Sequence, residues 1–536
     1  MAKKNQAIKI PKLKFTVNHA LVTLYTILMF TLFPLFLTNY YQSARRDKFW
    51  LFVIVTGAVG VSVGIIALCQ HFGKSTQKTA AYHDPFKLNL TDIGILAFLG
   101  VTLISTIGAV IVAEDPGQAF SSILLGSYGR NMGLLTILMF AVAYFCVSRY
   151  FYYNKYVIYF MFIGMTVMSF IAIVNFYYID ILGIFAKYSS DNVIQNFTST
   201  IGNKNYLSAM ITVALPFSVG LAVATKDKTM RLLAYISTGL QFMGLLVATS
   251  DGGFLGCFAA FAIMLVIVSR DMQKLSKFFF CLAIMMASAK LLWLFDLIMK
   301  GKNKGYTSFS EIFVYNNYVF ILIALFLGLA ILAGITKSES AGKYTFITTF
   351  ALVVIGFVAI VAMFIYYSVI NTEAPVGSFT RFFRFNAAWG THRGFFWIRS
   401  FDVMRDFNLW QVIFGSGPDT YYNVFKPYFG ELSKYYGDTS TNAAHNVYIN
   451  YLVTVGVAGI LSYLLFVGSA IVNSVKKSIT NPLALMCVGV IIAYAAQDIV
   501  NIANPVNTPW FIMFIALSES TRLRANSTER LDEVGF

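Results

Sequence analysis

The sequence carries little charge for its length. Only 12% of its 536 residues are Asp, Glu, Lys or Arg, whereas 58% are apolar. Soluble domains carry about 25% charged residues, so this chain is unable to cover a water-facing surface of its own size. Most of it is expected to face lipid, which excludes a soluble enzyme or binding protein.

Cysteine pairs and metal-binding motifs are missing as well. The five cysteines lie in or beside apolar runs, and none belongs to a Cys-x-x-Cys pair. No Asp-x-Asp pair occurs, and Glu114-Asp115 would make a poor cage for a divalent ion. The sequence therefore predicts no disulfide framework and no zinc site, and neither a metal nor another cofactor is expected.

Long apolar runs, by contrast, follow one another along the chain. A helix needs about 20 mostly apolar residues to cross a bilayer, and fourteen runs approach that length. They are 20–38, 50–70, 92–112, 132–149, 156–177, 205–224, 231–249, 252–269, 276–299, 316–335, 345–370, 446–473, 483–500 and 505–518. The last two are short and interrupted by Asn501, Asn504 and Pro505. The pattern predicts an all-α polytopic membrane protein with about 12–14 transmembrane helices.

These runs divide the chain into four parts. Residues 1–370 would hold transmembrane helices 1–11, and residues 446–518 the C-terminal transmembrane helices. Between them, 371–445 would form one large extracytoplasmic loop, and 519–536 a solvated cytoplasmic tail. The first run is followed by no small-residue cleavage site, so we expect it to stay as a span.

The net charge of +16 reports topology rather than nucleic-acid binding. Lys and Arg concentrate at the N-terminus and in alternate short loops, so the positive-inside rule puts both termini in the cytoplasm of a multi-pass cell-membrane protein. The lipid bilayer is the expected partner, and no nucleic acid is expected. Two external clusters, Arg45-Arg46-Lys48 and Lys300/Lys302/Lys304, run against this bias.

Most groups able to do chemistry lie in the large loop. Its segment 393–410 is amphipathic, with Trp397, Phe401 and Met404 on one face. This predicts an interfacial helix on the membrane surface or, with equal weight, a small packed external cap. The Gly415-Ser416-Gly417-Pro418 turn that follows would gather backbone N–H groups, an arrangement able to cradle an anion.

His445 closes the loop. An apolar run begins directly after it, which predicts a long helix with Asn446 and Asn450 one turn apart on a single polar face. A lone histidine at a helix start is more often a capping or interfacial residue than a catalyst. Polar groups at a membrane boundary are costly, however, and this favours a functional role.

Several short motifs, in order, resemble the O-antigen ligase and polymerase family of membrane glycosyltransferases. They are Asp115-Pro116, 129–135 (GRNMGLL), 202–207 (GNKNYL), Arg393-Gly394, 414–418 (FGSGP), 445–448 (HNVY) and 456–459 (GVAG). The succession covers roughly residues 90 to 515. One departure is Ser250-Asp251, because the family often carries an arginine after this serine.

The resemblance implies a GT-C-like fold and transfer of glycan from a polyprenyl (undecaprenyl) diphosphate donor. The acceptor would be a hydroxyl of a glycan, lipid or protein at the outer face of the membrane. His445 would act as the base and Arg393 would bind the diphosphate, without a metal. Four further residues are candidate substrate ligands: Arg130, Arg381, Arg384 and Asn446.

A lipid-linked oligosaccharide flippase or another multi-span transporter is the alternative. Many spans and a basic exterior suit it, and Lys290 and Asp296 in the ninth run are able to line a path. These two residues lie mostly on different helix faces, however, and no internal repeat is visible. The ionisable groups also crowd into one loop, which favours the enzyme.

Overall fold

The computed structural model describes residues 15–38, 40–72, 87–127, 129–185, 191–375, 377 and 380–536. Across these ranges the regular elements are all helices, and no strand occurs. Ten of the helices are long and apolar enough to cross a membrane. They are α1 (Val17–Leu35), α2 (Tyr40–Phe72), α3 (Leu90–Ile111), α6 (Lys155–Phe176), α8 (Lys204–Ala224), α9 (Lys228–Val247), α11 (Met272–Ile298), α13 (Tyr318–Ile335), α14 (Glu339–Ile365, continued by the π-helix η2, Tyr366–Ile370) and α21 (Gly456–Ser478). The prediction of an all-α polytopic membrane protein is confirmed.

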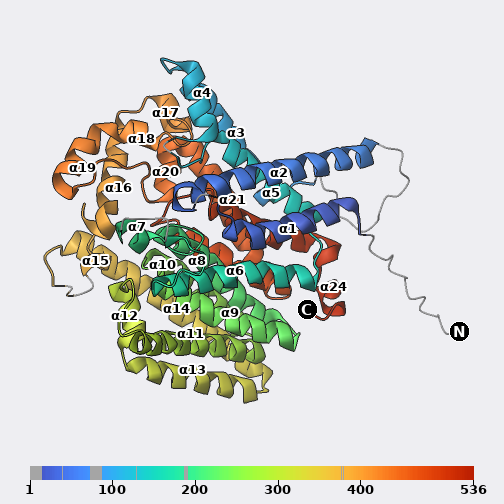
Figure 1. The fold of residues 1–536 in the computed structure, drawn as a ribbon. Helices are drawn as coiled ribbons and strands as arrows, with labels where there is room; N and C mark the ends of the chain where they lie inside the picture. Colours follow the sequence, from blue (N-terminus) through green and yellow to red (C-terminus); the bar gives the residue numbers. More distant parts are fainter. Residues whose placement is uncertain are drawn as a thin grey trace.

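Four shorter apolar helices complete the bundle. They are α5 (Leu134–Tyr150), α10 (Gly252–Val268), α22 (Pro482–Gln497) and α23 (Thr508–Glu519). Each of the fourteen apolar runs in the sequence thus overlaps a helix. The helices run roughly side by side, with a group of short helices at one end and the C-terminus at the other (Figure 1).

The run 446–473 is not one long helix, contrary to the sequence prediction. It forms α20 (Val447–Thr454) and then α21, with a break at Val455 and Gly456. Gly456 has a φ of 74°, and a Cβ on it would lie 2.3 Å from the carbonyl oxygen of Ile413. The chain breaks here because the preceding loop packs directly against its backbone.

The remaining elements are short. They are α4 (Pro116–Leu125), α7 (Asp191–Asn196), α12 (Ser308–Tyr315), α15 (Thr380–Phe383), α16 (Trp389–Arg405), α17 (Leu409–Phe414), α18 (Tyr421–Phe425), η4 (Lys426–Tyr428), α19 (Phe429–Tyr436), η5 (Ser520–Arg522), η6 (Arg524–Asn526) and α24 (Thr528–Glu533).

Residues 380–445, here named the cap, form a packed unit at one end of the bundle (Figure 1). The cap has its own apolar core of buried side chains: Phe395, Phe396, Val403, Tyr421, Phe425 and Leu432. The buried positions of α16 are Gly394, Phe395, Phe396, Ser400 and Val403. Of the apolar face predicted from the sequence, Trp397 and Met404 are partly buried and pack against the cap core, whereas Phe401 is 50% exposed. The prediction was therefore wrong for Phe401.

The segment 498–507 between α22 and α23 is not helical, as Asn501, Asn504 and Pro505 indicated. Irregular backbone at membrane depth has to be satisfied within the protein. The Asn504 side chain accepts from the backbone N–H of Val506 and Asn507, at 2.9 and 3.2 Å. This break lies beside α20, because the Val447 N–H donates to the Asp498 carbonyl at 2.9 Å.

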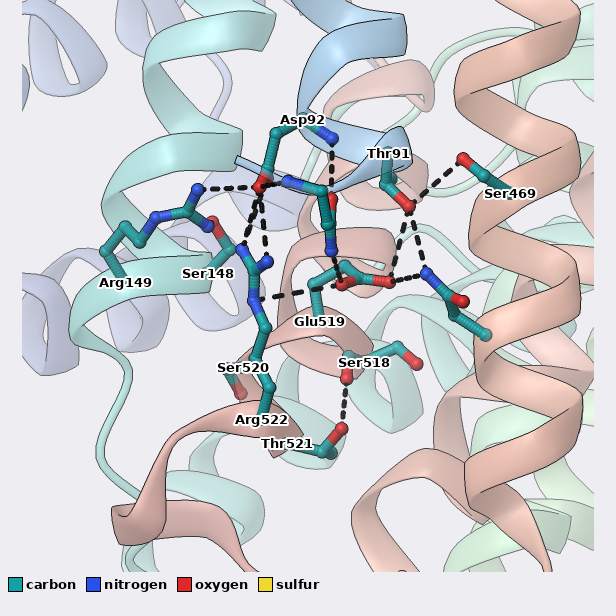
Figure 2. Close-up of polar contacts among 12 residues, drawn as sticks. Thr91, Asp92, Ser148, Arg149, Ser469, Ser518, Glu519, Ser520, Thr521 and Arg522 are labelled. Carbon is teal, nitrogen blue, oxygen red and sulfur yellow. Dashed lines mark hydrogen bonds and ion pairs between the residues drawn. The ribbon is translucent and has the colours of Figure 1, made fainter. Parts of the chain in front are cut away.

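The C-terminal segment is packed against the bundle and is not the solvated tail that its charges suggested. Arg522 donates to both carboxylate oxygens of Asp92 at 3.2 Å, and Arg149 lies 2.8 Å from the same carboxylate (Figure 2). Asn526 is fully buried and donates to the Phe151 carbonyl at 2.9 Å. Sequence charge predicted exposure, but the Arg522 side chain points inward to the buried carboxylates of Asp92 and Glu519.

Candidate active site

A tight turn at residues 126–133 joins α4 to α5. Gly126 has a φ of 96°, and a Cβ on it would lie 2.6 Å from the carboxylate of Asp419. Only glycine allows this approach. As a result, the backbone N–H groups of Ser127 and Met132 both donate to Asp419 Oδ2, at 2.9 and 3.2 Å.

Asp419 forms a buried ion pair with Arg130 of the same turn. Arg130 Nε lies 3.3 Å from Asp419 Oδ1, and the two side chains are only 3% and 1% exposed. Burial raises the pKa of Asp419 to about 6, although the Arg130 charge and the two backbone N–H groups oppose this shift. The carboxylate is therefore still ionised at neutral pH.

Arg130 also joins three segments that are far apart in the sequence. Its Nη1 donates to the Asn442 carbonyl at 2.8 Å and to Asn450 Oδ1 at 3.4 Å, and its Nη2 donates to the Ala503 carbonyl at 3.0 Å. One guanidinium thus ties the end of the cap, α20 and the break before α23 to the turn before α5. Most of its donors face protein acceptors.

His445 lies between the cap and α20. Its backbone is left-handed, with a φ of 52°, which costs a non-glycine residue about 1–3 kcal/mol. The neighbouring backbone is held on both sides. Trp397 Nε1 donates to the Ala444 carbonyl at 3.1 Å, and Asn446 Oδ1 accepts from the Ile449 N–H at 3.0 Å. Asn446 is therefore the N-cap of α20.

The His445 ring is partly exposed and stacks on Phe396, with centroids 5.6 Å apart and planes at 23°. Among the described residues, neither ring nitrogen has a hydrogen-bond partner. Burial, together with the charges of Arg393 and Arg130, lowers the pKa of His445 to about 3. The imidazole is thus neutral at physiological pH, with an unused lone pair and two nearby cations.

Arg393 follows an irregular start of α16. Gly390, Thr391 and His392 are all left-handed, with φ of 60°, 59° and 69°. Arg393 Nη1 donates to the Gly390 carbonyl at 2.5 Å, whereas its Nε is buried with no hydrogen-bond partner in the described part of the chain. Burial lowers the pKa of this guanidinium. A buried guanidinium with an unused donor is suited to an anionic ligand.

Arg384 is not joined to the site around His445. Arg384 donates through Nη2 to the Ala374 carbonyl, and no contact between described residues joins it to His445. The side chain of Arg381 lies outside the described residues. Asp251, at the position where the resemblance suggested an arginine, begins α10.

The glycine turn after α17 has a structural task. Gly415 and Gly417 have φ of 77° and 112°. The N–H groups of Ser416 and Gly417 donate to the carbonyls of Val453 and Thr454, at 3.2 and 2.9 Å. These groups clamp the end of α20, so they do not form the anion cradle that the sequence suggested.

The two ionisable residues considered for a transport path are held by neighbours. Lys290 Nζ donates to the Val314 carbonyl at 2.9 Å. Asp296 accepts from the Tyr177 hydroxyl at 3.0 Å and from the Asn303 amide at 2.9 Å. Both side chains thereby fasten the segment after α11 to the bundle.

Comparison with known families identifies the part of the chain that contains the cap. Residues 312–464 match the family described as O-antigen ligase. This part of the chain is similar to an O-antigen ligase domain. The match confirms the resemblance over the motifs that lie within it, from Arg393-Gly394 to 456–459, while a search of the curated proteins found no match. The matched region contains Arg393, Asp419 and His445, and Arg130, which lies outside it, pairs with Asp419.

Replacing Asp419 by asparagine tests the ion pair. Asparagine keeps the shape and tolerates the left-handed backbone, with φ of 61°, but it leaves the Arg130 charge buried and unpaired. We expect Asp419→Asn to cost about 3–5 kcal/mol of stability, seen as a lower melting temperature in detergent. The exposed Asp406 provides the control, and Asp406→Asn should change stability by less than about 0.5 kcal/mol. Coincident melting curves for Asp419→Asn and the unchanged protein would contradict the assignment.

Proposed function

We propose that this protein is a membrane glycosyltransferase that moves glycan from a polyprenyl diphosphate donor to an acceptor hydroxyl at the outer face of the cell membrane. The match to an O-antigen ligase domain supports glycan ligation in a membrane. The observation that carries the proposal is a partly exposed His445 ring that has no hydrogen-bond partner among the described residues and lies within reach of the Arg393 and Arg130 charges.

Arg393 is the residue best suited to bind the donor diphosphate. Its Nε is buried without a hydrogen-bond partner among the described residues, and a planar guanidinium binds phosphate oxygens through two parallel donors. Arg130 would act mainly through its charge, because its donors are engaged by Asp419, Asn442 and Ala503. Arg381, Arg384 and Asn446 remain candidates for contacts with the glycan.

Transfer needs a base for the acceptor hydroxyl. In the proposed step a ring nitrogen of His445 takes the hydroxyl proton as the acceptor oxygen bonds to the anomeric carbon of the donor sugar. The bond from that carbon to the diphosphate oxygen breaks, and the electron pair leaves with the diphosphate. Arg393 stabilises the charge on the leaving group, so this step requires no metal.

Donor binding would also make His445 a stronger base. The positive charges of Arg393 and Arg130 help to hold its pKa near 3. A diphosphate brings about two negative charges, which offset these cations and raise the pKa of the imidazole. The base would thus gain strength when the donor is bound.

His445→Asn tests the catalytic assignment. Asparagine accepts the left-handed backbone but cannot take up the proton, so we expect glycan transfer to fall by a factor of about 10² to 10⁴. His392 is the matched control, because it is also left-handed and lies in the cap, 3.5 Å from Asp438. Transfer from labelled lipid-linked glycan in membranes should survive in His392→Asn. Normal transfer by His445→Asn would remove His445 from the mechanism.

In the same assay we expect kcat/KM and kcat to depend on pH in different ways. In the free enzyme the pKa of His445 is about 3, so kcat/KM should not fall through its protonation between pH 5 and 8. In the donor complex the pKa is raised, so the acid limb of kcat should lie at higher pH than that of kcat/KM. An acid limb of kcat/KM near pH 6.5 that disappears in His445→Asn would contradict this order.

The outer-face location is tested by cysteine labelling. Ser433 is exposed on the cap, and Ser338 is exposed after α13, whose last turn contacts the start of α11 through Gln273 and Gly334. Cys69 is the exposed native cysteine among the described residues and is first replaced by serine. An impermeant maleimide should label Ser433→Cys on intact cells and Ser338→Cys only after permeabilisation. The reverse pattern would place the cap and His445 in the cytoplasm.

A further inference from the structure

The turn between α1 and α2 is fixed at the end of the bundle that carries the cap. Lys48 is fully buried, and its Nζ donates to the carbonyls of Phe36 and Thr200 at 2.8 and 2.9 Å. Asp47 Oδ2 accepts from the Thr38 backbone N–H at 2.8 Å. The start of α2 is therefore anchored to the bundle through the buried Lys48 side chain.

Arg45 extends from this turn toward the site. Its Nη2 lies so close to Gly129 that a Cβ there would be 2.7 Å away. Gly129 is the neighbour of Arg130, and the Arg45 charge acts on the carboxylate of Asp419. The Arg45 guanidinium forms no hydrogen bond or ion pair with a described residue. A cation with no partner in the described part of the chain thus lies at the edge of the proposed active site.

Arg46 is part of the lining of an apolar groove. The groove has a volume of about 470 Å³, and its lining residues are Phe36, Thr38, Arg46, Asp47, Trp50, Leu51 and Ile54. Trp50 is 42% and Ile54 64% exposed. Arg46 is also exposed and has no hydrogen-bond or ion-pair partner within the described ranges.

The spacing on α2 connects these features. Arg46, Trp50 and Ile54 are four residues apart, so they descend one face of the helix. Arg45 is rotated from Arg46 by about 100° around the helix axis. The Arg45 guanidinium therefore faces the active-site turn, whereas Arg46 lines the groove. A ligand spanning both would need a phosphate head and a long apolar tail.

We propose that this groove holds the first isoprenoid units of the polyprenyl diphosphate donor, with Arg46 and Arg45 binding its diphosphate at the edge of the active site. The proposal rests on the function proposed above and names the site through which the donor reaches it. These two guanidinium groups, which have no partner among the described residues, would bind the diphosphate together with Arg393. A zwitterionic phospholipid would instead bring an ammonium group toward one of the arginines.

The groove is tested by photo-crosslinking in the full-length protein. The probe is a polyprenyl diphosphate with a diazirine on the isoprene next to the diphosphate, added to protein in phosphatidylcholine nanodiscs. We expect adducts within residues 36–54. In Arg45→Gln/Arg46→Gln the yield should fall roughly tenfold or more, because charge-assisted phosphate contacts are lost. Lys302 is exposed after α11 and is not among the residues that line the groove, so Lys302→Gln should label as the unchanged protein does.

The outcomes separate this proposal from the proposed function. Three results would contradict the proposed donor site: adducts outside residues 36–54, full labelling of Arg45→Gln/Arg46→Gln, or equally strong competition by phosphatidylglycerol. If His445→Asn then still abolishes transfer, the proposed function stands alone. Labelling in the groove together with normal transfer by His445→Asn would leave the lipid site standing and reject the catalytic step. A melting temperature of the double variant equal to that of the unchanged protein would show that a lower crosslinking yield does not come from unfolding.

Discussion

The ion pair between Arg130 and Asp419 is the interaction on which the site depends. A buried guanidinium is costly unless its charge and its donors are matched. Here one carboxylate supplies the charge, and the Asn442 and Ala503 carbonyls take further donors. Because these acceptors come from different parts of the chain, satisfying one arginine fixes the cap, α20 and the α22–α23 break relative to the turn before α5.

This arrangement explains the electrostatic state of His445. Asp419 offsets Arg130 only in part, and Arg393 has no acidic partner in the described part of the chain. Burial first, and then the charges of Arg393 and Arg130, lower the pKa of His445 and keep the imidazole neutral. This state suits an enzyme with an anionic lipid carrier. The Arg393 and Arg130 charges lower the pKa of His445 in the empty site, and the same charges attract the donor phosphates. The bound phosphates would then raise the pKa of His445. Arg45 and Arg46 would extend that positive edge to the lipid.

Much of the fold was predictable because lipid imposes a simple rule on sequence: about 20 apolar residues per crossing. The position of His445 at the edge of the cap followed from the same rule. Residues governed by long-range contacts were not predictable. The charged C-terminal segment gave no sign that Arg522 would turn inward to Asp92. Asp419 stood in the sequence as one loop acid among several, since its partner lies 289 positions earlier and no spacing rule links them. The helix break at Gly456 likewise depends on a loop packed against it.

The central claim is that His445 is held as a neutral imidazole by burial and by the nearby charges of Arg393 and Arg130. Nitrogen-15 NMR of ring-labelled histidine, with His445 assigned by its loss in His445→Asn, measures this directly. The account predicts that the His445 ring in the donor-free protein stays neutral down to pH 5, in keeping with a pKa of about 3, and that added pyrophosphate raises this pKa. Half-protonation of the ring between pH 6 and 7 in the donor-free protein, as in an ordinary solvated histidine, would contradict it.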